Sequence, residues 1–237
     1  MLEIPDRRID MILCDLPYGV TARNKWDCVI PFDKLWEQYE RIIKPNGAIL
    51  LFGQGMFTAD LMHSNSKLWR YNLIWQKTQP TGFLNAKRMP LRCHEDIAVF
   101  YKSLPIYNPQ MSGGHARKVS KAEHKINCKS TTDYGEHGLT TYDSTYRYPL
   151  SVLKFPKDTQ KESYHPTQKP IALLEYLIKT YSNPGNIILD NCMGSGSTCI
   201  AAIKTDRKYI GFELNKRYFD IAKERIENAN KKYGETC

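Results

Sequence analysis

The chain has 237 residues and a formal charge of +9, from 34 lysines and arginines against 25 aspartates and glutamates. Its apolar residues, 41% of the total, are enough for a sizeable core, which excludes a disordered or fibrous protein. The apolar runs are shorter than the ~20 residues of a membrane span, and residues 1–6 lack the features of a signal peptide. We therefore expect a cytoplasmic protein with no membrane partner, whose charge favours polyanions such as nucleic acids.

The first part of the chain alternates apolar runs with amphipathic stretches. Strands are predicted at residues 9–14 and 48–52, and helices at 32–45 and 56–64. The first helix is expected to end at Lys44-Pro45-Asn46-Gly47. Because this order is that of a βαβ unit, it predicts a mostly parallel sheet.

Two further strands are predicted at residues 71–76 and 96–101. Since no helical pattern separates them, we expect them to pair antiparallel. The loop between them contains three basic residues, which are Lys87, Arg88 and Arg92.

From residue 103 to about residue 163 only eight of 61 residues are Leu, Ile or Val, and tyrosines alternate with lysines and arginines. Such a segment cannot build a large core of its own. One interpretation is a solvated insertion. The other, which charge and polarity favour, is a surface where cations neutralise phosphates and aromatic rings contact bases.

The last part returns to the α/β pattern. Helices are predicted at residues 171–181 and 198–204, strands at 187–190 and 209–212, and a final helix whose apolar stripe ends near residue 226 and which frays from Asn228. The seven cysteines form no Cys-x-x-Cys pair, so neither a disulfide framework nor a metal site is predicted.

Polar residues follow the first strand, in the order Asp15-Leu16-Pro17-Tyr18. A strand that ends in this way can simply be entering a loop. However, a carboxylate, a backbone carbonyl and an aromatic ring are also the groups that would hold the amino group of an extruded base. Proline has no N–H, so this turn presents acceptors.

A glycine-rich turn follows the strand 187–190. It would present backbone N–H groups at a helix start, but Cys199 stands where a Gly-x-Gly-x-x-Gly motif needs its third glycine, and no Gly-Lys-Ser/Thr follows. Pyrophosphate and triphosphate ligands are therefore disfavoured. An adenosine-type ligand remains, with Glu213 placed to bind its ribose.

Four segments together resemble the motifs of DNA amino-methyltransferases. DLPYG is similar to their Asp-Pro-Pro-Tyr motif, DNCMGSGST to their S-adenosylmethionine loop, GFELN to their ribose-binding strand, and HPTQKP to the segment before that loop. The resemblance covers roughly residues 4–102 and 164–228, in an order similar to the circularly permuted beta class. It implies a Rossmann-like α/β fold whose mostly parallel sheet has one antiparallel strand and an inserted target-recognition region.

The resemblance further implies transfer of a methyl group from S-adenosylmethionine to N6 of adenine in double-stranded DNA, with restriction–modification as the setting. The implied catalytic residues are Asp15, Leu16, Pro17 and Tyr18. The implied cofactor residues are His165, Thr167, Lys169, Asp190, Cys192, Gly194, Ser195, Gly196, Glu213 and Asn215; the alternative for His165, less favoured, is an ordinary loop residue. The residues expected to contact DNA are Lys87, Arg88, Arg92, Arg117, Lys118 and Lys121.

The implied organisation has three parts, a catalytic half at residues 1–102, a target-recognition insertion at 103–163 and a cofactor-binding half at 164–237. Asn191-Cys192 replaces the family's Pro-Phe, and Leu16 its first proline. The family's first strand is expected to be missing before residue 4, which would leave a sheet edge open beside residues 209–212.

Other functions stay open at this point. N4 of cytosine is the nearest rival target, and a DNA-binding protein with lost or reduced catalysis is compatible with the missing strand. An RNA or protein amide methyltransferase is disfavoured by the basic insertion, and a nicotinamide dehydrogenase by the incomplete glycine motif. Whether a restriction partner or a homodimer exists is also left open.

Overall fold

The computed structural model describes residues 1–19, 27–120, 141–158 and 168–234. The chain divides into two compact units. The first unit consists of Met1–Asn108 and Ser151–Cys237, and the second of Pro109–Leu150. Every motif singled out above, apart from some of the basic residues, belongs to the first unit.

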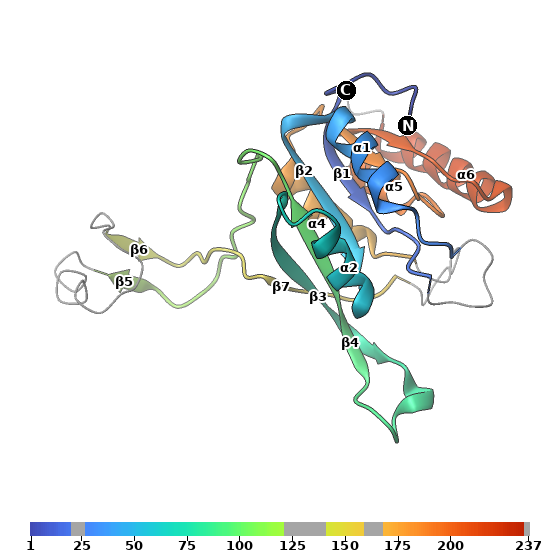
Figure 1. Ribbon diagram of the computed structural model, residues 1–237. Helices are drawn as coiled ribbons and strands as arrows, with labels where there is room; N and C mark the ends of the chain where they lie inside the picture. Colours follow the sequence, from blue (N-terminus) through green and yellow to red (C-terminus); the bar gives the residue numbers. More distant parts are fainter. Residues whose placement is uncertain (20–26, 121–140, 159–167, 235–237) are drawn as a thin grey trace. The chain divides into compact units, whose positions relative to one another are not determined.

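A seven-stranded sheet in the order β7-β3-β4-β2-β1-β8-β9 forms the centre of the first unit (Figure 1). Its strands are β1 (Ile9–Cys14), β2 (Ile43–Gly53), β3 (Trp69–Thr81), β4 (Arg92–Phe100), β7 (Val152–Phe155), β8 (Ile187–Asp190) and β9 (Lys208–Gly211).

Only one strand of this sheet is antiparallel to the others. β1 pairs in parallel with β2 and β8, β8 with β9, and β3 with β7, whereas β4 is antiparallel to both β2 and β3. The predicted α/β class, with a mostly parallel sheet and one antiparallel strand, is therefore confirmed, and circular permutation stays a prediction. Within the described residues β9 pairs with β8 alone and forms an edge of the sheet.

Helices cover both faces of the sheet, because its central strands are apolar on both sides. Along β1, the side chains of Met11 and Leu13 pack with helices α4 (Ile171–Tyr181) and α5 (Ser197–Lys204). Those of Ile12 and Cys14 pack on the other face. The helices there are α1 (Phe32–Ile42) and α2 (Met56–Ser64). This alternation places β1 in the middle of two apolar layers.

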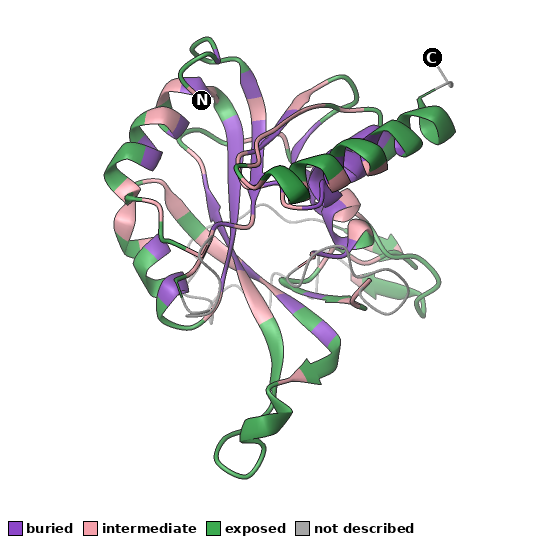
Figure 2. Cartoon of the chain, turned by 90° about the vertical axis from the view of Figure 1, so that its right-hand side faces the viewer, coloured by how far each residue is buried: buried purple, intermediate pink, exposed green. Residues whose placement is uncertain are grey.

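The last helix, α6 (Lys216–Tyr233), packs on α5 rather than on the sheet. Figure 2 shows its buried residues on one side and its exposed residues on the other. It begins at the N-cap Asn215, whose side chain accepts hydrogen bonds from the backbone N–H groups of Arg217 and Tyr218. None of the helices in the described ranges combines the length and the apolar character that a bilayer crossing requires.

Three predicted boundaries are wrong. α1 ends at Ile42, because strand β2 begins at Ile43 and runs through the segment that was expected to stop the helix. α6 continues to Tyr233 instead of fraying from Asn228, since Ala229 is still buried against α5. Residues 152–155 are strand β7 of the main sheet, although the sequence places them in the insertion.

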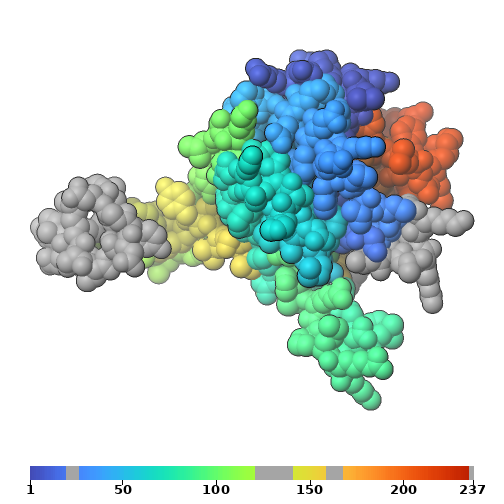
Figure 3. Space-filling model, viewed as in Figure 1, coloured from blue at the N-terminus to red at the C-terminus, as the bar shows by residue number. Residues whose placement is uncertain are grey.

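Strands β3 and β4 continue beyond the sheet as a hairpin whose tip contains the short 3₁₀ helix η1 (Phe83–Asn85). Figures 1 and 3 show this hairpin projecting from the rest of the first unit. Because β4 is antiparallel to β2 and pairs Asp96 with Gly53, the hairpin leaves the sheet at the carboxyl end of β2. It therefore rises from the same edge at which β1 ends.

The second unit contains a two-stranded antiparallel sheet of β5 (Lys118–Ser120) and β6 (Tyr142–Ser144). It is held mainly by polar contacts. The Arg117 guanidinium donates two hydrogen bonds, of 2.7 and 2.6 Å, to the carboxylate of Asp143. Tyr146 and Tyr148 are exposed aromatic residues of this unit.

Candidate active site

The carboxyl edge of the sheet brings together the polar residues that follow its parallel strands. Asp15 follows β1, Asp190 ends β8 and Glu213 follows β9. β1 and β8 are direct neighbours, with Ile12 opposite Leu189. Ligands of open α/β sheets bind at this edge, so the two main sequence motifs lie where such a site is expected.

Asp15 belongs to a chain of hydrogen-bonded and ion-paired side chains that we call the Asp15 cluster, made of Tyr18, Asp15, Lys169, Glu95 and Lys77. The Tyr18 hydroxyl donates to Asp15 Oδ1 at 2.7 Å, and Lys169 Nζ donates to Asp15 Oδ2 at 2.5 Å. Lys169 Nζ also lies 3.3 Å from Glu95 Oε2, and Lys77 is ion-paired with Glu95 Oε1. The cluster thus joins segments from the start, middle and last third of the chain.

Burial and charge oppose each other in this cluster. Burial raises the pKa of Asp15 above its ordinary value, although the Lys169 ammonium acts against the shift. Burial would also raise the pKa of Glu95, but Lys169 and Lys77 together lower it. Burial would lower the pKa of Lys169, but Asp15 and Glu95 raise it. With both acids ionised, the two carboxylates and two ammonium groups balance, which is the condition for burying charges without a large penalty.

The aromatic ring of Tyr18 is fixed from two directions. Its hydroxyl is held by Asp15, and its ring stacks on Phe57 with a centroid distance of 4.6 Å and an interplanar angle of 27°. Only one face of the ring is occupied by this stacking. The side chain of Leu16 is buried in the core, so its contribution to the turn is its backbone.

A second cluster forms around residues 190–196, which we call the glycine loop. Asp190 Oδ1 accepts from the backbone N–H of Cys192 at 3.0 Å. Glu213 accepts from the backbone N–H of Gly194 at 3.0 Å and from that of Asn215 at 2.7 Å. Glu213 therefore ties the loop to the following strand while keeping further lone pairs on both carboxylate oxygens.

Residues that the sequence analysis missed support the glycine loop from neighbouring helices. Arg225 of α6 donates to the Ser195 carbonyl at 2.5 Å, and Tyr39 of α1 donates to Asn191 Oδ1 at 2.5 Å. Arg225 could have been found, because it lies at helical spacing between the buried residues Ala222 and Ala229. Tyr39 could not, since its spacing places it with the buried apolar residues of α1.

The buried carboxyl group of Asp190 is expected to make the free energy of unfolding depend on pH. Burial raises the pKa of Asp190 from 3.8 to about 6. Between these values the unfolded chain loses the proton first, so the free energy of unfolding decreases with rising pH, by about 3 kcal/mol for this group. Asp190→Asn lacks this titration. Urea unfolding at pH 4 and pH 7 should therefore show the wild type losing about 2–3 kcal/mol more than the variant, and equal losses would contradict the assignment.

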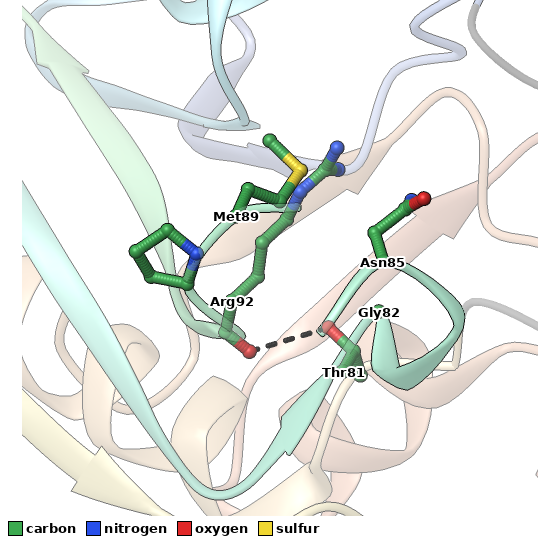
Figure 4. A pocket seen from close by; sticks show the side chains of 6 residues that line it. Thr81, Gly82, Asn85, Met89 and Arg92 are labelled. Atoms are coloured by element: carbon green, nitrogen blue, oxygen red, sulfur yellow. Dashed lines mark hydrogen bonds between the residues drawn. The ribbon is translucent and has the colours of Figure 1, made fainter. Parts of the chain in front are cut away.

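The basic residues of the hairpin are exposed. Lys87 and Arg88 lie at the tip, and Arg92 donates to Gln54 Oε1 at 3.0 Å. A pocket of about 270 Å³ opens here (Figure 4), lined by Thr81, Gly82, Asn85, Met89, Pro90 and Arg92. Two of the lining residues are linked by a hydrogen bond, which the Thr81 hydroxyl donates to the Arg92 carbonyl at 3.3 Å.

The other predicted site residues fall into three groups. Arg117 and Lys118 are in the second unit, where Arg117 is already paired with Asp143. Asn215 caps α6, and Cys192 lies half-buried in the glycine loop. His165, Thr167 and Lys121 lie outside the described residues.

The family model of the DNA methylase family matches residues 9–224, nearly the whole chain. The chain belongs to this DNA methylase family. DNA adenine methyltransferase YhdJ of Escherichia coli is 27% identical over 241 residues, which cover 96% of this chain and 79% of that protein. The match supports the family suggested by the sequence motifs.

Solved structures of DNA methyltransferases have the same fold. The M1.HpyAVI–SAM complex superposes with a TM-score of 0.60 and 25% identity, covering 92% of this chain and 89% of that one. The cytosine-N4-specific PvuII DNA methyltransferase superposes with a TM-score of 0.65 at 13% identity, over 98% and 87% of the two chains. This DNA methylase is therefore a DNA methyltransferase of the N6-adenine/N4-cytosine family, and DNA is its partner.

Proposed function

We propose that this DNA methyltransferase methylates N6 of adenine in double-stranded DNA, with S-adenosylmethionine as the methyl donor. The observation that carries the proposal is the Asp15 turn, which offers acceptors beside an aromatic ring whose one stacking partner among the described residues is Phe57. An amino group of an extruded base needs such acceptors, and the base needs such a ring. Adenine is favoured because the relative YhdJ is described as an adenine methyltransferase.

The glycine loop fits the donor. Gly196 has φ +81°, and a Cβ there would lie 3.2 Å from Ala222, so the backbone approaches α6 more closely than another residue would allow. The buried hydroxyl of Ser197, at the start of α5, has no hydrogen-bond partner among the described residues. S-adenosylmethionine supplies the methyl group when bound. Its site would use the remaining proposed residues, which are His165, Thr167, Asp190, Cys192, Gly194, Ser195, Gly196, Glu213 and Asn215.

The chain's own part in the reaction is to hold the target. Asp15 and the Leu16 carbonyl accept from the amino group, which orients a nitrogen lone pair toward the donor methyl. Tyr18 holds the base by stacking, and Pro17 keeps a competing N–H out of the turn. No covalent enzyme intermediate is required, so none of the cysteines need be a nucleophile.

We further propose that the hairpin and the second unit, Pro109–Leu150, bind DNA, with the second unit reading the target sequence. The double variant Lys87→Ala/Arg88→Ala removes two exposed cations from the tip. It should lower the slope of log affinity against log salt by about 2, because each phosphate contact contributes about 0.9. Fluorescence anisotropy with a labelled duplex at several salt concentrations measures this slope.

Lys44→Ala is the control for this experiment. Lys44 pairs with Asp10 near the amino end of β1, at the opposite edge of the sheet from the hairpin. This variant should keep the wild-type slope. An unchanged slope in the hairpin variant would remove the tip from the DNA-binding surface.

Incubation of unmethylated DNA with the enzyme and labelled S-adenosylmethionine, followed by mass analysis of the nucleosides, tests the proposed reaction. Label in N6-methyladenine is expected. Label in N4-methylcytosine would instead identify N4 of cytosine as the target, since the acceptors of the Asp15 turn suit either amino group. Absence of label from DNA would overturn the proposal. A homodimer stays a prediction, which light scattering after size-exclusion chromatography would test.

A further inference from the structure

Lys169 occupies a position that its predicted cofactor role does not explain. Its ammonium lies 2.5 Å from Asp15 Oδ2 and 3.3 Å from Glu95 Oε2, and its side chain is only 9% exposed. A lysine is rarely buried unless paired charges compensate for lost hydration. This chain therefore maintains a buried cation directly beside the acceptor for the target amino group.

The hydrogen-bonding groups of this pair are not all used. Of the three N–H donors of the Lys169 ammonium, one makes a described hydrogen bond, to Asp15 Oδ2. Glu95 Oε2 is ion-paired with Lys169 Nζ at 3.3 Å but has no hydrogen-bond partner among the described residues. The ring centres of Phe52 and Tyr18 also lie 5.0 and 6.0 Å from the ammonium. Each oxygen of Asp15 accepts one described hydrogen bond, from Tyr18 or from Lys169, and so keeps a lone pair. An acceptor and a donor thus lie next to each other at the catalytic turn.

This pattern complements one kind of base edge. In adenine the N6 amino donor is next to the N1 acceptor, and in cytosine the N4 amino donor is next to the N3 acceptor. Guanine and thymine have the reverse order, an oxygen acceptor next to an N–H donor. A carboxylate beside an ammonium therefore matches the first two bases and opposes the other two, because each mismatch leaves a buried polar group unpaired.

The ring of Tyr18 places a base against both groups. Asp15 is hydrogen-bonded to the Tyr18 hydroxyl, and Lys169 Nζ lies over the Tyr18 ring, 6.0 Å from its centre. Phe57 stacks on the same ring. A base held against this ring would therefore lie beside both Asp15 and Lys169.

We propose that Lys169 donates a hydrogen bond to the ring nitrogen beside the methylated amino group, N1 of adenine or N3 of cytosine. This inference rests on the proposed function. Glu95 is a positioning residue, since it competes with Asp15 for the ammonium and keeps Lys169 from being committed to Asp15 alone. Lys77 in turn holds the other oxygen of Glu95. Lys169 thus selects bases in which the amino donor lies next to a ring nitrogen that accepts a hydrogen bond, as in adenine and cytosine.

Deaza analogues test the contact atom by atom. Duplexes are built on a site at which the wild-type enzyme places its label, with either the normal base or its analogue at the target: 1-deazaadenine for an adenine target, 3-deazacytosine for a cytosine target. Both analogues keep the amino group and replace the ring nitrogen by C–H. For the wild type we expect kcat/KM, at saturating cofactor, to fall about 10- to 100-fold on the analogue.

Lys169→Met removes the donor and keeps the length of the side chain. On the normal base, kcat/KM of this variant should be lower than that of the wild type by a similar factor. Its kcat/KM on the analogue, however, should differ from its kcat/KM on the normal base by no more than about threefold. Its affinity for S-adenosylmethionine, measured by calorimetry, should stay within about threefold of the wild type. Lys44→Met, which breaks a lysine–aspartate pair at the opposite edge of the sheet, should keep the full wild-type penalty.

Two results would overturn the inference. If the wild-type enzyme has the same kcat/KM on the analogue as on the normal base, it makes no contact with the ring nitrogen. This measurement does not depend on the folding of a variant. Equal analogue penalties in the wild type and Lys169→Met would assign Lys169 to another role, such as cofactor binding. Absence of methylation by the wild type on every DNA would instead refute the proposed function itself.

Discussion

Asp15→Ala is expected to lower the rate of methyl transfer about 100- to 10,000-fold while leaving the affinity for S-adenosylmethionine within about threefold. The carboxylate is the side-chain acceptor of the turn, and alanine offers nothing in its place. The cofactor site, in contrast, is proposed to be built from the glycine loop and Glu213, which follow β8 and β9 rather than β1. Single-turnover transfer and calorimetric titration with the cofactor measure the two effects separately.

Removal of Asp15 also changes the balance of the Asp15 cluster. Lys169 then keeps Glu95 as its counter-charge, so the variant is expected to remain folded at a reduced stability. Asp15→Asn, which preserves the shape and one acceptor, should lose less activity than Asp15→Ala. Equal loss of transfer and cofactor binding in Asp15→Ala would refute the division of labour between the two motifs.

Gly196→Val is expected to abolish detectable cofactor binding. The residue has φ +81° at the N-terminus of α5, a conformation that costs a β-branched residue about 1–3 kcal/mol. Its Cβ would also lie 3.2 Å from Ala222 and Ile226 of α6, which would push the glycine loop away from the helix. Equilibrium dialysis with labelled S-adenosylmethionine would measure the loss, and thermal unfolding the cost in stability.

Gly185→Val is a close control. Gly185 has the same φ of +81°, but a Cβ there meets no atom within 4 Å. The two variants should therefore share the cost of the backbone strain, while only Gly196→Val adds crowding and loss of binding. If both variants bind the cofactor equally well, the close approach of the glycine loop to α6 is not needed for the site.

The sequence predicts most of the core because its signals are local. The helices α2 and α4 were expected at the residues where they are found, and the antiparallel pairing of β3 with β4 followed from the absence of a helix between them. The end of α1 was not predictable from Pro45 and Gly47. Those residues do stop helices, but the parallel partner β1 recruits the segment from Ile43 into the sheet.

The Asp15 cluster could be predicted only in part. Asp15 and Tyr18 are adjacent in the chain, so their motif is visible, whereas Lys77, Glu95 and Lys169 meet only because three separate segments converge. The position of Glu95 depends on the register of β4, in which Glu95 lies opposite Trp75. That register is fixed by packing and hairpin geometry, and no local pattern reveals it.

The position of β1 also constrains the order in which the chain can fold. β1 precedes both of its neighbours in the chain, pairs with β2 on one side, and receives its second neighbour only when β8 is complete. The backbone N–H of Ile187 then donates to Asp10 across 177 residues of sequence, at 2.9 Å. During synthesis this central strand is therefore left with one edge unpaired. Such long-range pairing makes folding slow and leaves the nascent chain open to aggregation until β8 emerges from the ribosome.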